Sequence, residues 1–302
     1  FNNGANITET YDPQTTSYDY DAALTEAGDL TKRFYEVRAV AEKYFDNLPE
    51  ITVTNTPKKA YGKLKLTEIA DLMSQLDNLS VPVKSAYPKT MEELGCDFGF
   101  TLYSTVIDYP TEAPLVIEPL RDRALIFFNG VFQGVKERDR RNDDIQFVCK
   151  RGEKVRIDIL VENMGRVNYG TQMWDNEKGL VNGARLGQQY MFNWTMYPLA
   201  MDDITGLTYK SYEKTINPAF YRGELQIDGT PCDTFLRLDD FHKGFVKVNG
   251  FNVGRYWTDA GPQKTLYIPA PVLKEGKNEI VVFELHGCEK NEIEFTDSPD
   301  LG

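Results

Sequence analysis

The sequence predicts a mainly β protein in which one β-module is used twice, and three observations support this. From about residue 97 onward, short runs of alternating apolar and polar residues are separated by turn residues. Asn129-Gly130 and Asn249-Gly250 each stand between apolar runs, which is typical of a two-residue hairpin. The hairpin sequences 123–134 and 243–254 also align with each other at a separation of 120 residues.

A second pair of segments repeats in the same order. Residues 152–162 resemble residues 276–284, at an offset close to that of the hairpins. Two matches in one order indicate a module of roughly 90–120 residues, the size of a β-sandwich or jelly roll with about eight short strands. The sequence therefore predicts two consecutive β-sandwich domains, at residues 89–200 and 201–302.

The first 88 residues follow a different pattern. Residues 1 to about 20 are polar and are expected to form a loop. From Leu24 to Tyr44, apolar residues recur at three- and four-residue steps, which predicts a packing helix. Residues 51–88 mix short segments, including a second helix expected to begin at Thr67. We interpret this stretch as a linker between domains.

The composition excludes several classes of protein. The 34 Lys and Arg residues stand against 46 Asp and Glu residues, a net charge of −12. Nucleic-acid binding needs a clustered basic face, so no nucleic-acid partner is expected. No apolar run approaches the ~20 residues of a membrane span, so we expect a soluble chain. With two histidines and no metal-ligand, dinucleotide or phosphate-loop spacing, the sequence predicts no metal and no cofactor.

Sequons and cysteines bear on the cellular route of the protein. Three Asn-x-Ser/Thr sequons mark candidate N-glycosylation sites, at Asn6, Asn78 and Asn193. The four cysteines divide evenly between the two predicted β-domains. This division permits the disulfides Cys96–Cys149 and Cys232–Cys288, with free buried thiols as the alternative. Together these features favour a secretory route.

Carboxylates are the main candidates for acid–base chemistry. Retaining hydrolysis of a glycoside requires two carboxyl groups about 5–5.5 Å apart. Asp19 and Asp21 lie two residues apart and would face the same way in an extended segment. Tyr18 and Tyr20 flank Asp19, and a tyrosine offers a ring to the apolar face of a sugar and a hydroxyl to its polar rim. The alternative is a packed loop whose carboxylates are structural.

Three motifs, in family order, resemble the β-galactosidases of glycoside hydrolase family 35. The first comprises residues 3–6, 16–22 and 24–29, with the run Thr-Ser-Tyr-Asp-Tyr-Asp. The second is Leu-Val-Glu-Asn-Met-Gly-Arg-Val-Asn-Tyr-Gly at residues 160–170, and the third comprises residues 248–257 and 261–263. Weaker similarity covers the rest of the chain. The chain resembles the C-terminal portion of such an enzyme, of the lysosomal animal type.

The resemblance implies an architecture. Residues 1–50 would be the last piece of a (β/α)₈ TIM barrel, the catalytic domain of the family. Residues 51–88 would be the linker, and two jelly-roll domains would follow. The glutamates that act as acid/base and nucleophile belong to earlier barrel strands, so they are expected before Phe1. This chain alone is therefore expected to be inactive.

The resemblance also implies roles for particular residues. Tyr20 would hydrogen-bond a terminal galactose, Tyr18 would line the same pocket and Asp19 would support the loop. Tyr169 would reach the rim of the pocket from the first β-domain. Independently of the resemblance, the residue type predicts burial in sandwich cores or domain contacts, rather than a role as sugar platforms, for Trp174, Trp194 and Trp257.

The function that the resemblance implies is retaining exo-β-galactosidase activity of the intact protein on terminal β-galactose of glycoconjugates. The expected location is the lysosome or outside the cell. The expected partners are the galactoside substrate, the N-terminal barrel segment, and a second copy or another lysosomal enzyme. The alternative is a non-catalytic carbohydrate-binding or interaction protein derived from such an enzyme.

Overall fold

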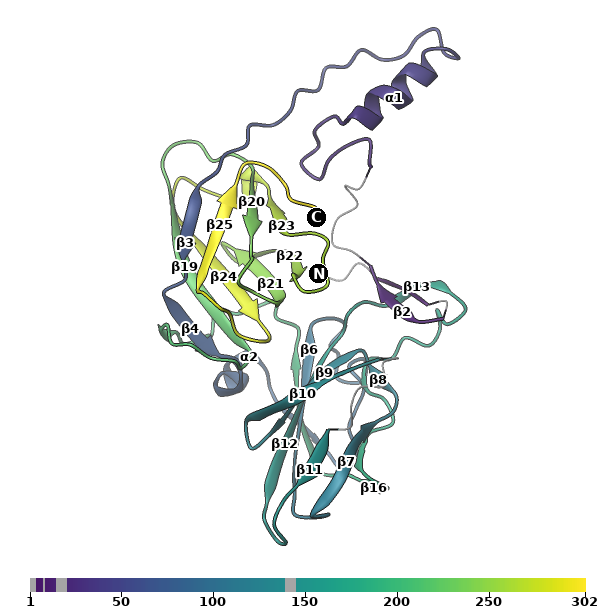
Figure 1. Cartoon of the computed structure of the whole chain (residues 1–302), viewed down its shortest axis with the longest axis vertical. Coiled ribbons are helices and arrows are strands. Elements are labelled where there is room, and N and C mark those ends of the chain that lie inside the picture. Colours follow the sequence, from purple (N-terminus) through teal and green to yellow (C-terminus); the bar gives the residue numbers. More distant parts are fainter. Residues whose placement is uncertain (1–3, 8, 15–20, 139–144) are drawn as a thin grey trace. The chain divides into compact units, whose positions relative to one another are not determined.

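The computed structural model describes residues 4–7, 9–14, 21–138 and 145–302, and it is mainly β, as predicted. The chain divides into two compact units (Figure 1). Unit 1 comprises residues 1–14 and 75–207, and unit 2 comprises residues 15–74 and 208–302. Within the described ranges, no helix is long and apolar enough to cross a membrane.

The larger sheet of unit 1 has six antiparallel strands in the order β10-β9-β12-β6-β17-β5. The strands are β5 (Val83–Ser85), β6 (Phe100–Ile107), β9 (Arg123–Phe128), β10 (Val131–Glu137), β12 (Val155–Glu162) and β17 (Trp194–Leu199). Alternate residues of the central strand β12 enter the core, where Ile157 and Ile159 are fully buried.

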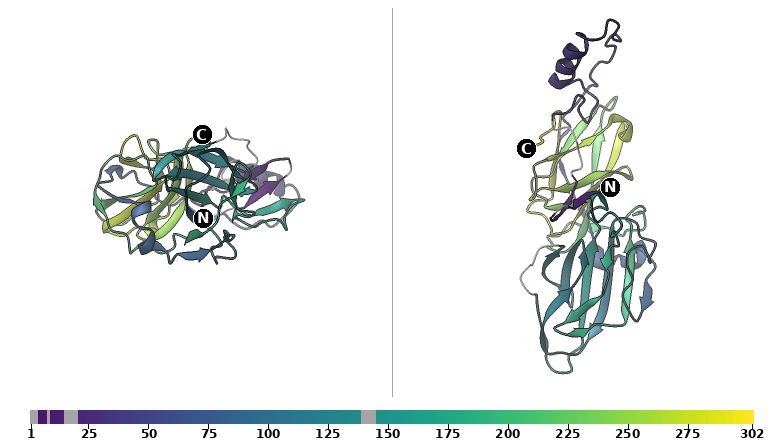
Figure 2. Two further views of the ribbon diagram at one scale, coloured as in Figure 1. Left: turned by 90° about the horizontal axis from the view of Figure 1, so that it is seen from below. Right: turned by 90° about the vertical axis from the view of Figure 1, so that its right-hand side faces the viewer.

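A smaller sheet packs on this one through a shared apolar core, and both sheets can be followed in blue, teal and green in Figures 1 and 2. Its order is β11-β7-β15-β16. The strands are β7 (Glu112–Ile117), β11 (Gln146–Val148), β15 (Ala184–Leu186) and β16 (Gln189–Tyr190). Leu115 and Phe147 from this sheet and Trp194 from the larger one are buried together in the core. Unit 1 is thus a β-sandwich.

A small three-stranded sheet attaches the N-terminal segment to unit 1. Its order is β13-β1-β2, formed by β13 (Val167–Gly170), β1 (Ala5–Ile7) and β2 (Tyr11–Pro13). β1 runs parallel to β13 and antiparallel to β2. The unit also contains the strand pair β8 (Leu120–Arg121) and β14 (Gly179–Leu180) and the short helix α2 (Leu76–Leu79).

Unit 2 is a second sandwich. Its larger sheet has the order β18-β4-β19-β24-β21-β22, and its smaller sheet has the order β23-β20-β25-β3 (Figure 1). The larger sheet contains β4 (Glu68–Asp71), β18 (Lys210–Ser211), β19 (Ala219–Ile227), β21 (Lys243–Val248), β22 (Phe251–Trp257) and β24 (Gly276–Glu284). The smaller contains β3 (Gly62–Lys65), β20 (Thr234–Arg237), β23 (Thr265–Ile268) and β25 (Glu292–Thr296). Tyr221, Phe241 and Phe295 lie in the core between the sheets.

The two sandwiches share one strand arrangement but differ in chain order. In both units, a hairpin forms one edge of the six-stranded sheet: β10-β9 in unit 1 and β22-β21 in unit 2. The next two strands of the sheet are β12 and β6 in unit 1, and β24 and β19 in unit 2. The next strand is β17 in unit 1, near the end of that unit's chain, but β4 in unit 2, near its start. Unit 2 is therefore a circularly permuted version of unit 1.

The predicted hairpins are both present, and they match in detail. Asn129 and Gly130 join β9 to β10 with φ angles of +47° and +79°, and Asn249 and Gly250 join β21 to β22 with +51° and +83°. Both pairs of positive φ angles fit a type I′ turn. In each copy a register shift follows three residues after the turn glycine, so one extra residue forms a bulge before the second glycine of the repeat.

Each turn asparagine also holds the neighbouring strand. Arg156 N–H of β12 donates to Asn129 Oδ1 at 2.8 Å, and Glu279 N–H of β24 donates to Asn249 Oδ1 at 3.0 Å. The Asn249 amide makes two further bonds, to Val272 O at 2.9 Å and to the buried Asn278 Oδ1 at 2.8 Å. The repeat therefore preserves a turn that is bonded to a third strand.

The stretch interpreted as a linker, residues 51–88, is different in the structure. It contributes β3 and β4 to unit 2 and β5 to unit 1. The helix expected from Thr67 is wrong, because Ile69 and Ala70 lie on β4, buried beside β19. Only a 3₁₀ turn (Leu72–Ser74) and α2 follow. Pairing in the sheet interior outweighs the helical spacing of this short segment.

The first predicted helix is present only in part, as α1 (Lys32–Ala41), whereas residues 24–31 are not helical. It is capped by the Thr31 side chain, which accepts from Phe34 N–H. None of its residues is buried. Several large apolar side chains on or near it are exposed: Tyr35, Val37, Val40, Tyr44 and Phe45. The helix thus presents apolar residues that no part of the described chain covers.

The predicted disulfides are not formed, and all four cysteines are free thiols. The Cys96 thiol bonds to Phe98 O just before β6, whereas the Cys149 backbone bonds to Thr111 beyond the other end of that strand. An eight-residue strand separates them by about 25 Å, far beyond disulfide reach.

The second predicted pair is separated in the same way. Cys232 precedes β20, and Cys288 bridges to Phe241, which follows that strand. The two thiols therefore lie at opposite ends of β20. Burial raises the pKa of Cys96 and raises that of Cys288 to about 11, so both stay protonated.

The turn asparagines yield a first prediction. Replacing either by Gly keeps the positive φ but removes the side-chain bonds. We expect Asn129→Gly to lower the free energy of unfolding by about 1 kcal/mol, since one bond is lost. Asn249→Gly should cost about 2 kcal/mol, because three are lost and Asn278 is left without that partner. Urea unfolding measures the loss of free energy in each variant, and hydrogen exchange of the β12 and β24 peptides locates it. Equal losses in the two variants would contradict this prediction.

Candidate functional site

The motif at residues 160–170 forms the end of β12, a short loop and β13. Asn163 fixes the loop: its N–H donates to Gly99 O at 3.0 Å, its amide donates to Asp97 O at 2.9 Å, and its Oδ1 accepts from Gly165 N–H at 3.0 Å. Gly165 has φ +132°, and a Cβ there would come within 2.4 Å of Gly4 O. Only glycine allows this close approach.

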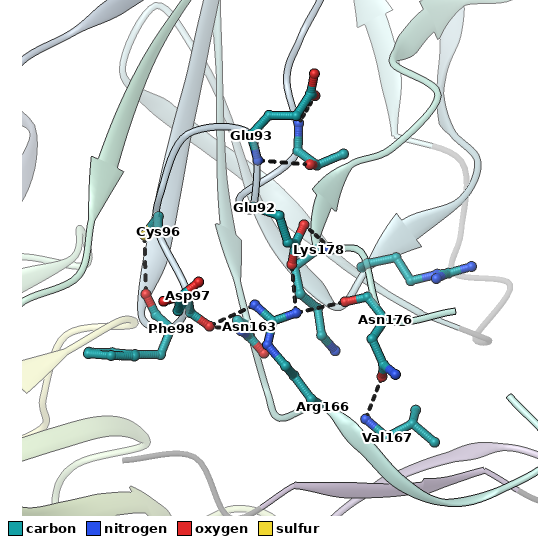
Figure 3. Close-up of polar contacts among 12 residues, drawn as sticks. Glu92, Glu93, Cys96, Asp97, Phe98, Asn163, Arg166, Val167, Asn176 and Lys178 are labelled. Atoms are coloured by element: carbon teal, nitrogen blue, oxygen red, sulfur yellow. Dashed lines mark hydrogen bonds and ion pairs between the residues drawn. The ribbon is translucent and has the colours of Figure 1, made fainter. Parts of the chain in front are cut away.

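Arg166 connects three segments around the motif (Figure 3). Its Nη1 donates to Glu92 Oε1 at 2.6 Å and to Asn176 O at 2.9 Å, and its Nη2 donates to Asp97 O at 2.9 Å. Asn176 Oδ1 in turn accepts from Val167 N–H at 2.7 Å. The start of β13 is therefore fixed by hydrogen bonds from the Arg166 side chain and from the Val167 backbone.

Glu92 is the acidic partner in this network. Its second oxygen accepts from Lys178 N–H at 3.0 Å. Burial alone would raise the pKa of Glu92, but the hydrogen bonds from Lys178 N–H and the Arg166 guanidinium outweigh burial and lower it. Glu92 therefore stays ionised in mildly acidic solution, and the network persists there.

A buried charge cluster lies beneath the motif. Asp122 and Lys178 are fully buried, and Lys178 Nζ donates to Asp122 Oδ2 and to Gly165 O, both at 2.6 Å. Asp122 also accepts from Arg138 Nη1 at 3.1 Å and from Met164 N–H at 2.9 Å. Burial lowers the pKa of Lys178 to about 8, against the opposing pull of Asp122. The ion pair and its hydrogen bonds keep the lysine charged near neutrality.

Tyr11 of β2 joins this cluster to the N-terminal hairpin. Its hydroxyl lies 3.2 Å from Asp122 Oδ2 and also bonds to Gly165 O. The Arg138 guanidinium lies 4.5 Å and the Lys178 ammonium 4.9 Å from the centroid of its ring. Both cations therefore contact the negative face of one aromatic ring. The cluster fixes the hairpin to the motif.

Strand β13 and the loop that follows it carry exposed aromatic residues. Tyr169 is 66% exposed and Trp174 is 85% exposed, with Met173 between them in sequence. Next to Trp174, both carboxylate oxygens of Asp175 accept from Arg121, at 2.8 and 2.9 Å. These bonds fix the loop. Exposed aromatic rings on a fixed loop suit stacking against the apolar face of a sugar.

The predicted site residues are only partly described by the structure. Tyr18, Asp19 and Tyr20 lie outside the described residues, so their predicted roles remain predictions. Tyr169 lies on β13, where its backbone partner on β1 is Asn6. Of the predicted glycosylation sites, Asn6 is half-buried, whereas Asn78 and Asn193 are exposed.

The tryptophans differ from one another. Trp194 is buried in the core of unit 1, as expected. Trp257 is half-buried, and the Lys243 ammonium lies 4.3 Å from the centroid of its ring. Burial of Trp174 in the sandwich core is wrong, because its loop lies outside that core and the residue is exposed, whereas its burial in a domain contact stays a prediction.

Unit 2 holds a fully buried acid, Glu284, at the end of β24. Its carboxylate accepts from the backbone N–H groups of His242 at 2.8 Å and His286 at 2.7 Å. Lys243 N–H also donates to it at 3.2 Å, and the Tyr256 hydroxyl donates at 2.8 Å. Burial nevertheless raises the pKa of Glu284 to about 7.

Sequence reasoning missed both Asp122 and Glu284. Asp122 had one signal: it stands between two arginines just before an apolar strand, where a charge needs a partner. Glu284 had none, because it ends an ordinary strand pattern. Within the ranges that the structure describes, no three His, Cys, Asp or Glu residues are grouped to hold a metal.

The fold and the comparisons define a class of protein. Residues 1–44 match the model of glycosyl hydrolases family 35. Residues 88–200 match the first all-β domain of β-galactosidase, and residues 218–278 match its galactose-binding domain. A glycosidase segment followed by two β-sandwiches is a multidomain glycoside hydrolase arrangement. The chain belongs to glycosyl hydrolase family 35, and the predicted resemblance is confirmed.

Curated relatives support the same family. The chain is 39% identical to a β-galactosidase of Bos taurus over 98% of its own length and 50% of the relative's. It is 38% identical to the β-galactosidase of Homo sapiens, over 99% of this chain and 48% of the relative. It also matches the human β-galactosidase-1-like protein 2 at 38% identity, over 100% of this chain and 48% of that protein. The chain spans about half the length of these relatives.

Among solved structures, an apo lectin of Pleurotus ostreatus has 13% sequence identity and a TM-score of 0.22, over 83% of both chains. A β-galacturonidase of Eisenbergiella tayi bound to galacturonate has 10% identity and a TM-score of 0.25, over 78% of this chain and 39% of that one.

The charge cluster yields a second prediction. Asp122→Asn leaves Lys178 and Arg138 without their buried counter-charge, and we expect it to lower the free energy of unfolding by about 3–5 kcal/mol. Asp108→Asn is the control, because Asp108 is exposed. The urea concentration at the unfolding midpoint is measured for both variants and compared with that of the parent chain. An Asp122→Asn loss no larger than that of the control would contradict the role of the cluster.

Glu284 yields a third prediction, on pH. Its folded-state pKa of about 7 lies above the ordinary value of 4.5, so the folded protein binds a proton more readily than the unfolded chain. The resulting stabilisation is complete below about pH 4.5 and is lost as the pH rises through 7. We expect unit 2 to lose up to about 3 kcal/mol between pH 4.5 and 8.

Glu284→Gln tests this directly, because glutamine does not titrate. Hydrogen exchange of the β24 and β21 peptides should vary with pH in the parent chain, and this component should be absent from the variant. Glu279→Gln, at a half-exposed carboxylate, is the matched control. The same pH profile in parent and Glu284→Gln would exclude Glu284 as the source.

Proposed function

We propose that this chain forms part of a retaining exo-β-galactosidase that removes terminal β-galactose from glycoconjugates. In this proposal the two catalytic glutamates lie on earlier barrel strands of the intact protein. One attacks the anomeric carbon while the other protonates the leaving oxygen, and water then hydrolyses the galactosyl-enzyme and releases galactose. The chain described here contributes pocket residues and the β-sandwiches.

The observation that carries the proposal is the exposed helix α1. It lies in the segment that matches the family 35 model, and its apolar side chains Tyr35, Val37 and Val40 are each more than half exposed. A helix with uncovered apolar residues requires a further packing partner. A barrel contributed by the rest of an intact enzyme would cover them.

The proposed substrate contacts come from two regions. Tyr18 and Tyr20 would contact the terminal galactose, with Asp19 supporting their loop. Tyr169 would complete the rim, and its high exposure leaves its ring available. The hydrogen bonds that hold the start of β13 support this role, because a preorganised aromatic group loses little conformational entropy on binding.

A second candidate function is carbohydrate binding without hydrolysis. The exposure of Trp174 and of Tyr169 favours it, since exposed aromatic rings could bind a sugar without any catalytic group. In either case, we propose a lysosomal or secreted location. The pKa of Glu284 supports an acidic compartment, because the folded protein is stabilised there. A second copy or another lysosomal enzyme remains a proposed partner.

The fourth prediction concerns activity. The intact protein from its native source should hydrolyse an aryl β-galactoside and release β-galactose first, as proton NMR would show. Residues 1–302 alone should show no hydrolysis above the uncatalysed rate. Hydrolysis by this chain alone would contradict the upstream position of the catalytic pair. An intact protein that binds galactose but does not cleave the aryl galactoside would favour the second candidate.

A further inference from the structure

The three sequons occupy different environments. Asn6 lies on the middle strand of the sheet β13-β1-β2, where its Oδ1 accepts from the Gln14 amide at 3.4 Å. Asn78 lies in α2, and its amide donates to Gln75 Oε1 at 2.8 Å. Asn193 is exposed in a turn, and its side-chain amide makes no hydrogen bond within the described residues. Of the two exposed sequon asparagines, Asn193 is the one whose side-chain amide is not hydrogen-bonded to another described residue.

The backbone at Asn193 is held in place. Its φ is +61°, in the left-handed region that asparagine tolerates better than most residues. Its N–H donates to Ala86 O at 2.9 Å, and the next residue, Trp194, pairs with Ser85 on β5. The Asn193 turn is therefore fixed to the segment that contains Ala86 and Tyr87. A group attached to this side chain would start from a defined position.

An exposed aromatic pair lies beside this turn. Phe192 precedes Asn193, Tyr87 follows Ala86, and their ring centroids are 5.4 Å apart at an interplanar angle of 83°. The rings are 41% and 66% exposed, respectively. Thr105 Oγ1 donates to Phe192 O at 2.7 Å, so the backbone under the pair is fixed as well. An exposed, fixed aromatic pair suits contact with the C–H face of a sugar ring.

We propose that Asn193 carries an N-linked glycan whose innermost N-acetylglucosamine packs on the Phe192–Tyr87 pair. Asn193 Nδ2 forms a bond to the sugar's anomeric carbon, as the bond from that carbon to a lipid-linked pyrophosphate donor breaks. The amide loses one proton, and the lipid pyrophosphate leaves. This inference rests on the proposed secretory route but not on hydrolytic activity.

The site is tested in the full chain secreted from eukaryotic cells. Glycopeptide mass spectrometry should find Asn193 occupied, and Asn193→Gln should remove one glycan from the mass of the protein. Asn78→Gln is the matched control at the other exposed sequon. Occupancy at Asn78 without occupancy at Asn193 would overturn the proposal and leave the secretory route standing. A secreted chain with no glycan at any sequon would overturn the proposal, and failure to enter the secretory pathway would overturn both.

The contact with the aromatic pair has its own test. An endoglycosidase that leaves the innermost N-acetylglucosamine should not change the Tm. An amidase that removes the whole glycan should lower it by about 2–4 °C, the usual effect of ~1 kcal/mol in a domain of this size. In Phe192→Ser both treatments should leave the Tm unchanged, whereas Phe251→Ser, at an exposed ring in unit 2, should behave as the parent. Equal losses in the parent and Phe192→Ser would rule out stacking on this pair.

Discussion

The buried carboxylate of Asp122 is the point on which the architecture of unit 1 depends. Burying a carboxylate is costly, and the cost is offset only when donors surround it. Here the donors come from Arg138, Met164 and Lys178, which lie far apart in the sequence. Tyr11 adds a fourth segment. The carboxylate can therefore be satisfied only when these segments are correctly assembled, which makes the cluster a determinant of specificity as much as of stability.

The exposed loop depends on this buried cluster. The Lys178 ammonium donates to Gly165 O, and the Lys178 backbone N–H donates to the Glu92 carboxylate. The Glu92 carboxylate also accepts a hydrogen bond from the Arg166 guanidinium. Figure 3 shows the bonds that join Glu92 to Arg166 and Lys178. Together with the buried cluster, they support the strand that presents Tyr169. A long exposed side chain on an unsupported loop would lose conformational freedom on binding a ligand. Because the network already fixes the backbone at Tyr169, less conformational entropy is lost when a ligand binds.

Sequence reasoning succeeded where structure is encoded locally. The Asn-Gly turns were predictable because positive φ at two successive residues permits few amino acids. The interpretation of residues 51–88 failed because Ile69 and Ala70 are strand residues only by virtue of β19, whose sequence lies far away. The Asp122 and Glu284 environments could not be predicted for the same reason. Their partners are brought together by the fold and share no sequence spacing.

The permuted order of unit 2 has a consequence for synthesis. Ala70 on β4 pairs with Phe220 on β19, 150 residues later. A ribosome that makes the chain from its N-terminus therefore completes every strand of unit 1 before β4 has a partner. During that interval the β3–β4 segment carries an unpaired strand with buried-type residues, which is the kind of segment that chaperones bind. During synthesis, unit 2 therefore stays incomplete until after all strands of unit 1 have been made.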